Sequence, residues 1–251
     1  MIQLKGKNAL ITGGSAGLGA AVAHQLAAEG VNIAINYANN KDRADSLAKE
    51  LETKYPGIKT TVLKADVFKI DELTQLVEST VEQLGGIDIL ISNAGWTKFI
   101  DYTDLDGMDE EAWDGTFNAN IKAHYFLFKA AKKYFDANED GGVFIASASV
   151  AGLITYGSSI PYAVSKAGLI HMIKFLAKTQ GPKVRLHAVC PGLLLTEWGK
   201  KFPQEKIEMS KSKSPIGQVT DVEECASHYV LLSKLSTSTG TIVGMDAGIS
   251  L

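Results

Sequence analysis

Tyr162 stands four positions before Lys166 in the segment SIPYAVSKAG, residues 159 to 168. If residues 162–180 form a helix, these two side chains share one face. A cation about 4 Å from a phenolate contributes on the order of 4 kcal/mol at an effective dielectric near 20. That energy would lower a phenol pKa from about 10 by roughly three units, into the range where general acid–base catalysis works best. The spacing alone also fits a packed tyrosine beside a solvated lysine, so other residues must decide between the two interpretations.

A glycine-rich turn near the N-terminus indicates a second function, the binding of an anion. The segment ALITGGSAGLG contains Gly13, Gly17 and Gly19 at the spacing Gly-x-x-x-Gly-x-Gly, with Ser15 and Leu18 between them. Glycine allows a positive φ and lets main-chain N–H groups approach a pyrophosphate, and a helix N-terminus adds partial positive charge. The spacing differs from Gly-x-Gly-x-x-Gly and from a P-loop. We predict a dinucleotide site here; the alternative is a merely tight strand-to-helix connection.

The end of the next apolar stretch bears on which dinucleotide is bound. Asn36 and Tyr37 stand there, and no acidic residue follows until Asp42. A carboxylate at this place would accept hydrogen bonds from the ribose of NAD and repel the 2′-phosphate of NADP. Its absence favours NADP(H), with NAD(H) still possible, and Lys41 and Arg43 lie where they could reach a phosphate.

A further acidic residue follows the third apolar stretch, at Asp66 and Val67. Its carboxylate could accept a hydrogen bond from the adenine amino group. A role in a turn or a helix cap fits it nearly as well.

The elements that must position these residues alternate regularly along the chain. Apolar strand candidates occur at 8–12, 31–36, 60–65, 87–92, 142–147, 184–189 and 241–245. Helical patterns lie between them at 19–29, 41–55, 71–84, 110–138, 162–180 and 221–232. Thr220 and Glu223 have the spacing of a capping box at the start of the last helix. Strands that alternate with helices predict an α/β fold, a doubly wound and mostly parallel sheet of about seven strands with helices on both faces.

Composition narrows the class of protein and of partner. The 251 residues carry a formal net charge of −3 with no basic stripe, which argues against nucleic acid and favours a small-molecule ligand. No signal segment or membrane-length apolar run is apparent, so we expect a cytoplasmic protein with no membrane partner. Cys190 and Cys225 show no paired spacing, and the five histidines show no metal spacing, so no metal is expected. No linker divides the chain, which predicts a single domain over 1–251.

Seven motifs together resemble the short-chain dehydrogenase/reductase family over nearly the whole chain, in its order and approximate spacing. They are NALITGGSAGLG, ADV at 65–67, ISNAG at 91–95, FNANI at 117–121, IASAS at 145–149, PYAVSK at 161–166 and CPGLLLT at 190–196. The family transfers hydride between a nicotinamide cofactor and a carbonyl or secondary alcohol, and its members are often homotetramers or dimers. The resemblance therefore implies the same reaction and a homo-oligomer. Two departures are Ser92, where the family commonly has Asn, and Ala247, where it usually has Gly.

The same resemblance implies the catalytic roles. Tyr162 would donate or accept the proton, and Lys166 would bind the nicotinamide ribose and lower the phenol pKa. Ser149 would hydrogen-bond the substrate oxygen, and Asn120 would help to hold a proton-relay water. Ser147 lies on the same face of the strand, so only the family spacing prefers Ser149.

The resemblance also assigns the remaining cofactor contacts. The segment after the fourth strand would touch the adenine ribose, and the segment after the sixth would contact the nicotinamide. These residues are Asn93, Ala94, Gly95, Pro191, Gly192 and Thr196.

The substrate side is less defined by the sequence. Trp96 and Trp198 follow two cofactor segments and either line a substrate pocket or pack as ordinary aromatic residues. The charged stretch 196–218 contains Pro203 and Pro215 and predicts a substrate-loop excursion, either a lid over the site or a solvated surface segment.

Overall fold

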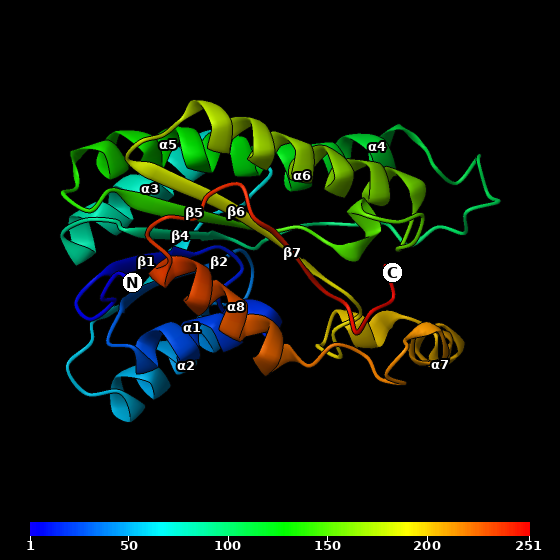
Figure 1. Cartoon of the computed structure of the whole chain (residues 1–251), viewed down its shortest axis with the longest axis horizontal. Coiled ribbons are helices and arrows are strands. Elements are labelled where there is room, and N and C mark those ends of the chain that lie inside the picture. The colour runs from blue at the N-terminus through cyan, green and yellow to red at the C-terminus, as the bar shows by residue number, and fades with distance from the viewer.

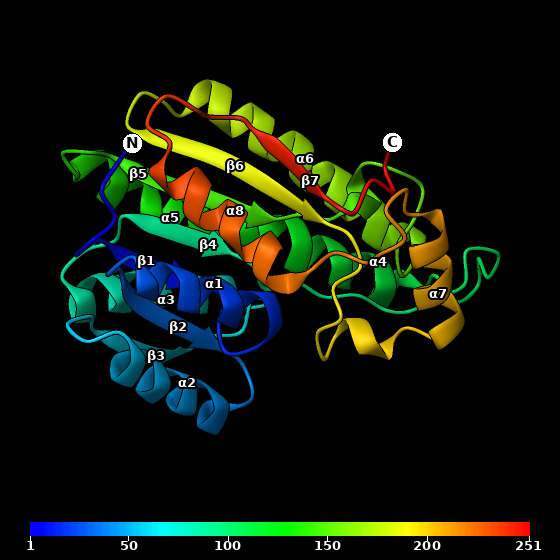
Figure 2. The same cartoon turned by 60° about the horizontal axis from the view of Figure 1, so that its bottom comes forward.

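The computed structural model describes all 251 residues and contains one parallel sheet of seven strands in the order β3-β2-β1-β4-β5-β6-β7. The strands are β1 (Asn8–Ile11), β2 (Asn32–Tyr37), β3 (Thr60–Lys64), β4 (Ile89–Ser92), β5 (Gly142–Ser147), β6 (Val184–Pro191) and β7 (Ile242–Met245). The direction of winding reverses between β1 and β4, which are neighbours in the sheet (Figure 2). Ligands of open α/β sheets bind at the carboxyl ends of the strands at such a reversal. The predicted doubly wound fold is confirmed.

Helices cover both faces of the sheet (Figure 1). One layer holds α1 (Gly17–Ala28), α2 (Lys41–Lys54) and α8 (Val222–Lys234), and the other holds α3 (Ile70–Leu84), α5 (Ala123–Ala137) and α6 (Ile160–Thr179). Successive β1 side chains serve different layers, because Ile11 packs into one hydrophobic cluster and Leu10 into the other. Strands buried on both faces read as continuous apolar runs, which is why their positions follow from the sequence.

The long helix expected over 110–138 is interrupted. It consists of α4 (Glu110–Phe117), a π-helical segment η1 (Asn118–Lys122) and α5. The wider π turn makes i to i+5 hydrogen bonds, as the Ala123 N–H does to the carbonyl of Asn118. Nothing in the 3.6-residue apolar periodicity reports such a bulge, and Asn120 lies inside it.

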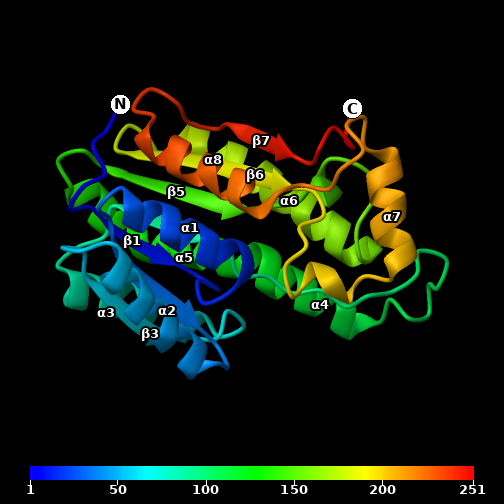
Figure 3. The same cartoon turned by 90° about the horizontal axis from the view of Figure 1, so that it is seen from below.

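The excursion after β6 contains its own secondary structure. Leu194 and Thr220 form an isolated parallel bridge at its base. Between them lie a 3-10 turn, η3 (Gly199–Lys201), and a helix, α7 (Gln204–Lys213). Figures 2 and 3 place α7 beyond the carboxyl ends of the strands, near the C-terminus, and the Ser214 hydroxyl donates a 2.8 Å hydrogen bond to the Ala247 carbonyl there.

The predicted capping box at the start of α8 is wrong by one residue. The cap is Asp221, whose carboxylate accepts the N–H of Glu224 at 2.9 Å. Thr220 is occupied elsewhere, because its hydroxyl donates to the Met245 carbonyl at 2.8 Å. No helix of the structure combines the length and the apolar character needed to span a bilayer.

Candidate active site

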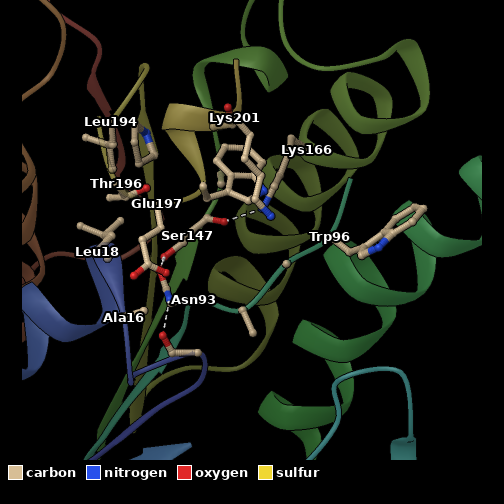
Figure 4. Close-up of a pocket in the computed structure, with 18 of the residues that line it drawn as sticks. Ala16, Leu18, Asn93, Trp96, Ser147, Lys166, Leu194, Thr196, Glu197 and Lys201 are labelled. Atoms are coloured by element: carbon tan, nitrogen blue, oxygen red, sulfur yellow. Dashed lines mark hydrogen bonds between the residues drawn. The ribbon is translucent and has the colours of Figure 1, made fainter. Parts of the chain in front are cut away.

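A cavity of about 410 Å³ opens at the carboxyl ends of the strands (Figure 4). It brings together residues from the glycine turn, the ends of β4 and β5, the start of α6 and the segment after β6. The predicted site residues that line it are Gly13, Gly17, Leu18, Asn93, Ala94, Gly95, Trp96, Ser149, Tyr162, Lys166, Pro191, Gly192, Thr196 and Trp198. Those that do not line it are Ser15, Gly19, Asn36, Tyr37, Asp66, Val67 and Asn120.

Tyr162 reaches this cavity from the first turn of α6. Ser159 caps the helix by accepting the Tyr162 N–H, and Pro161 suits the first turn because it lacks a donor. The phenol is almost fully buried, and burial raises the pKa of Tyr162 to about 12. The hydroxyl of Ser149, which hydrogen-bonds the phenol, acts in the opposite direction and lowers it. Tyr162 is therefore protonated at neutral pH in this structure.

Lys166 lies one turn further along α6, and its ammonium group is directed at the end of β5. Its Nζ donates a 2.8 Å hydrogen bond to the Ser147 carbonyl and lies 5.7 Å from the centre of the Tyr162 ring (Figure 4). Burial lowers the pKa of Lys166 to about 8. The expected lowering of the phenol pKa by this cation is not what the structure shows, because burial of the phenol dominates its pKa.

The two serines at the end of β5 have different partners. Ser147 is engaged, since its hydroxyl lies 2.7 Å from the Tyr229 hydroxyl and donates to Asn93 Oδ1 at 3.1 Å. Ser149 accepts the Ala151 N–H at 3.1 Å and faces the Tyr162 phenol. Alternation along a strand cannot separate the two serines, whereas these contacts do.

Asn120 does not line the cavity but holds a residue that does, Trp96. Its Oδ1 accepts the Trp96 N–H and its Nδ2 donates to the Trp96 carbonyl, both at 2.9 Å. Nδ2 also donates to the Ser165 hydroxyl at 3.0 Å. The side chain therefore fixes the segment that follows β4. The role of Asn120 with a relay water stays a prediction.

The glycine turn has the features of an anion cradle. Gly13 and Gly17 have φ values of 60° and 53°, which glycine adopts without strain. A Cβ on Gly19 would lie 2.4 Å from the Gly13 carbonyl oxygen, so a side chain cannot fit there. No side chain caps the N-terminus of α1, which begins at Gly17 and leaves its first N–H groups facing the cavity mouth. These features fit a dinucleotide pyrophosphate.

Asn36 and Tyr37, two of the predicted cofactor contacts, do not line the cavity. Asn36 is buried and braces the turn instead, with Oδ1 accepting the Gly13 N–H at 3.2 Å and Nδ2 donating to the Ala65 carbonyl at 3.1 Å. Tyr37 is buried beside it in β2 and lies outside the cavity wall.

The acidic residue after β3 makes contacts typical of a turn. The carboxylate of Asp66 accepts the Phe68 N–H at 3.0 Å, and the Asp66 N–H donates to Glu72 at 2.8 Å. Neither Asp66 nor Val67 lines the cavity. These contacts favour the turn interpretation over an adenine contact.

The basic residues at the start of α2 behave differently from each other. Lys41 pairs with Asp45 on the exposed side of the helix at 2.6 Å. Arg43 lines the cavity, and its Nη1 lies 2.8 Å from Glu197 Oε2. Its Nε is buried without a hydrogen-bond partner. Arg43 is thus the cation best placed for a phosphate on the adenosine side.

Aromatic side chains form the opposite part of the cavity wall (Figure 4). The Trp198 ring lies 6.1 Å from that of Tyr162 and also contacts Phe99 and Phe202. Trp96 packs edge-on against Phe68 at 6.2 Å. Both tryptophans line the cavity, and Trp198 is the one next to the phenol.

The prediction of the cavity wall missed six of its residues: Ala16, Ser147, Ala148, Leu194, Glu197 and Lys201. Ser147, at the end of β5, and Ala148 could have been inferred only from their closeness in sequence to Ser149. Ala16 lies in the glycine turn, and Leu194, Glu197 and Lys201 lie in the segment after β6, whose path the sequence pattern does not specify. No group of three or more His, Cys, Asp or Glu side chains is placed to hold a metal ion.

The chain is similar to known proteins over nearly its whole length. A family model described as enoyl-(acyl carrier protein) reductase matches residues 13–250. A 3-oxoacyl-acyl-carrier-protein reductase of Thermotoga maritima is 34% identical over 251 residues, covering 99% of both chains.

Two solved structures are also similar. A short chain dehydrogenase from Burkholderia cenocepacia J2315 in complex with NADP has a TM-score of 0.90 at 28% identity and full coverage of both chains. An NADPH-dependent 3-quinuclidinone reductase from Rhodotorula rubra has a TM-score of 0.91 at 26% identity, covering 98% of this chain and 92% of its own.

Proposed function

The chain belongs to the short-chain dehydrogenase/reductase family, and from that premise we propose that it is an NADP(H)-dependent oxidoreductase that interconverts a carbonyl group and a secondary alcohol. The observation that carries the proposal is the shared cavity. Tyr162, Ser149 and Lys166 line it together with Gly13 and Gly17 of the glycine turn. An acid–base group and an anion cradle therefore face one space.

The protein side of the reaction follows from the contacts around the phenol. When bound, the nicotinamide supplies or accepts the hydride. In the reductive direction Tyr162, which is protonated at neutral pH, donates a proton to the substrate oxygen. Ser149 donates a hydrogen bond to the same oxygen and stabilises the charge that develops on it. In the oxidative direction the phenolate form of Tyr162 takes the proton back.

Lys166 tunes this step through its position. Its pKa of about 8 lets it change charge near neutral pH, and its hydrogen bond to Ser147 O holds it beside the phenol. A protonated Lys166 favours the phenolate and so assists the oxidative direction. The proposed contact of Lys166 with the nicotinamide ribose is consistent with its place in the cavity wall.

NADP(H) is the proposed cofactor because of the residues on the adenosine side. The end of β2 offers no carboxylate that would repel a 2′-phosphate, since Asn36 and Tyr37 stand there. Arg43 places a guanidinium in the cavity wall, and a guanidinium matches a phosphate with paired N–H donors. The solved relatives named with NADP and NADPH support the same cofactor.

The substrate is proposed to carry an apolar group beside its carbonyl. Trp198 lies against the Tyr162 ring, so the substituent on the reacting carbon must pack on an aromatic surface. The T. maritima relative is named for reduction of 3-oxoacyl groups, which makes 3-oxoacyl thioesters the first candidates within this class.

The proposed assembly is a homodimer or homotetramer. Helix α6 exposes Ile160 and Val164 one turn apart and Phe175, which is 65% exposed, about three turns further along the same side, with His171 between them. Exposed apolar side chains that share one helix face support a protein interface there.

A substrate panel tests the proposed reaction. Consumption of NADPH and of NADH is followed with a simple ketone, a 3-oxoacyl thioester and an enoyl thioester. We expect turnover with NADPH and one of the carbonyl substrates. Reduction of the enoyl thioester alone would place the reaction at a carbon–carbon double bond. Binding of NADPH without turnover of any substrate in the panel would instead favour a dinucleotide-sensing protein on the same fold.

A further inference from the structure

One ion pair joins the two sides of the cavity mouth. Arg43, in the first turn of α2, lies 2.8 Å from Glu197, which is 154 residues away in the segment after β6. Both residues line the cavity. The pair therefore links the adenosine side of the site to the base of the excursion that carries α7.

The segment that carries Glu197 lies directly over the glycine turn. A Cβ on Gly17 would be 3.2 Å from the Cβ of Thr196. Figure 4 shows Thr196 and Glu197 on the same side of the cavity as Ala16 and Leu18, away from Trp96. The carboxylate of Glu197 is thus held next to the place where the phosphates of a dinucleotide must bind.

The donors of Arg43 are only partly used by this contact. Nη1 is bonded to Glu197, whereas Nε is buried without a partner. A guanidinium binds a phosphate through paired N–H donors, a stronger arrangement than a single contact with one carboxylate oxygen. Glu197 is 80% exposed and makes no other hydrogen bond, so water can solvate it readily once it leaves Arg43.

We propose that Glu197 competes with the 2′-phosphate of NADP(H) for Arg43, and so sets both the affinity and the selectivity for the phosphorylated cofactor. The inference rests on the proposed NADP(H) dependence. The cofactor exchanges one anion for another on the same guanidinium. NAD(H) has no such group, and it binds with the Arg43–Glu197 pair in place.

The size of the effect follows from the strength of exposed ion pairs. Such a pair favours its closed state, with the two charges in contact, over its open state, with them apart, by a factor of roughly 1.4 to 5. A ligand that needs the open state loses apparent affinity in proportion to the open fraction. Removing the carboxylate should therefore tighten NADPH binding roughly two- to sixfold.

The test is a set of equilibrium titrations on the full chain, with the fluorescence of bound NADPH or NADH as the readout and no substrate present. The variants are Glu197→Gln, Arg43→Gln and the double variant. Glu205→Gln is the matched control, because it removes the same charge from an exposed position in α7. We expect Glu197→Gln to tighten NADPH two- to sixfold and leave NADH unchanged, with no effect of Glu205→Gln.

The double variant isolates the competition. In the Arg43→Gln background, Glu197→Gln should no longer change NADPH affinity, because the shared partner is absent. Equal tightening of NADPH and NADH by Glu197→Gln would overturn the proposal, since the carboxylate would then act by repelling the pyrophosphate that both cofactors carry. An unchanged NADPH affinity in Glu197→Gln would overturn it as well.

Failure of the underlying cofactor assignment gives a different result. If NADP(H) is not the preferred cofactor, wild type binds NADH at least as tightly as NADPH and Arg43→Gln changes neither. If Arg43→Gln weakens NADPH selectively but Glu197→Gln has no effect, only the competition is wrong.

Discussion

Burial holds Tyr162 in its protonated form, while the hydroxyl of Ser149, which hydrogen-bonds the phenol, favours ionisation. Lys166 is also buried and is pushed toward its neutral form, with a pKa of about 8. The neutral phenol can donate a proton at neutral pH, and Lys166 loses its proton more readily than a solvated lysine does. The site is therefore arranged so that a ligand in the cavity can change the balance between the two protonation states.

The two serines of β5 allow a matched comparison of catalysis and support. Ser149→Ala removes the proposed donor to the substrate oxygen, and we expect kcat to fall by about 10²- to 10³-fold with little loss of stability. Ser147→Ala breaks the contacts with Tyr229 and Asn93, so we expect a lower unfolding free energy, by about 1 kcal/mol, and a smaller change in kcat. Steady-state kinetics measure kcat, and denaturant unfolding measures the free energy of unfolding of each variant. A larger loss of kcat in Ser147→Ala than in Ser149→Ala would assign the substrate contact to Ser147 and the supporting role to Ser149.

Lys166→Met tests the cost of burying an ammonium group. The unfolded chain holds this proton up to a pKa near 10.5, whereas the folded chain releases it near 8. Below about pH 8 the folded protein must bury the charge, so the variant should be more stable than wild type by up to about 3 kcal/mol. As pH rises from about 8 to 10.5, wild type gains stability and the difference should close. Denaturant unfolding of both proteins at several pH values measures this difference in unfolding free energy. A difference that widens between about pH 8 and 10.5 contradicts the prediction.

At the scale of elements, the glycine turn and the π-helical segment are the two parts whose backbone positions the site. Gly19 belongs to the first turn of α1, where the helix packs against the Gly13 carbonyl. The π segment brings Asn120 under Trp96 and so fixes the chain that follows β4. The glycine turn lines the cavity itself, whereas the π segment acts from behind through the side chain of Asn120.

Gly19→Ala tests the turn. Its Cβ would lie 2.4 Å from the Gly13 oxygen and 2.9 Å from the Asn93 amide, so the turn must shift. We expect a loss of about 1–3 kcal/mol in unfolding free energy and a weaker binding of NADPH by tenfold or more. Gly244→Ala is the control, because a Cβ there meets nothing within 4 Å and the residue lies in β7. Unaltered NADPH binding in Gly19→Ala would mean that the turn does not hold the cofactor.

At the scale of the whole molecule, the face of α6 that carries Ile160, Val164 and Phe175 remains exposed. Phe175→Glu places a charge on that face, and if the proposed dimer or tetramer forms through it, we expect light scattering to show a smaller species than for wild type. Leu105→Glu is the control, because Leu105 is 73% exposed in the loop before α4. A monomeric wild type, or an assembly indifferent to Phe175→Glu, rejects this face as the interface.

The sheet, its parallel order and most helices could be predicted because buried strands and amphipathic helices leave regular apolar patterns. The interruption at Asn118–Lys122 could not, since a single extra residue in a helical turn keeps the local apolar face. Ala247 stands where the family usually has glycine, and only the structure shows the backbone conformation at this position. Its φ is 54°, a conformation that favours the glycine the family usually has there.

The site also contains residues whose places could be predicted from the sequence and residues whose places could not. Tyr162, Ser149 and Lys166 meet at the cavity as their motifs predicted, because strand ends and one helix turn determine their places. The partner of Arg43 could not be predicted, since Glu197 reaches it from a loop 154 residues away. The contact of Asn36 with the glycine turn could not be predicted, because the sequence cannot tell whether a side chain at a strand end faces a ligand or the neighbouring turn.

The substitution Tyr162→Phe tests the central claim most directly. It removes one hydroxyl and leaves the ring that packs against Trp198. The measurement is the turnover of NADPH with the best carbonyl substrate, beside an NADPH fluorescence titration, with Tyr134→Phe in α5 as a control that loses the same hydroxyl outside the cavity. We predict a loss of kcat of about 10²- to 10⁴-fold with NADPH binding retained, and no loss in the control. Turnover unchanged in Tyr162→Phe would contradict the assignment of Tyr162 as the acid and base of the reaction.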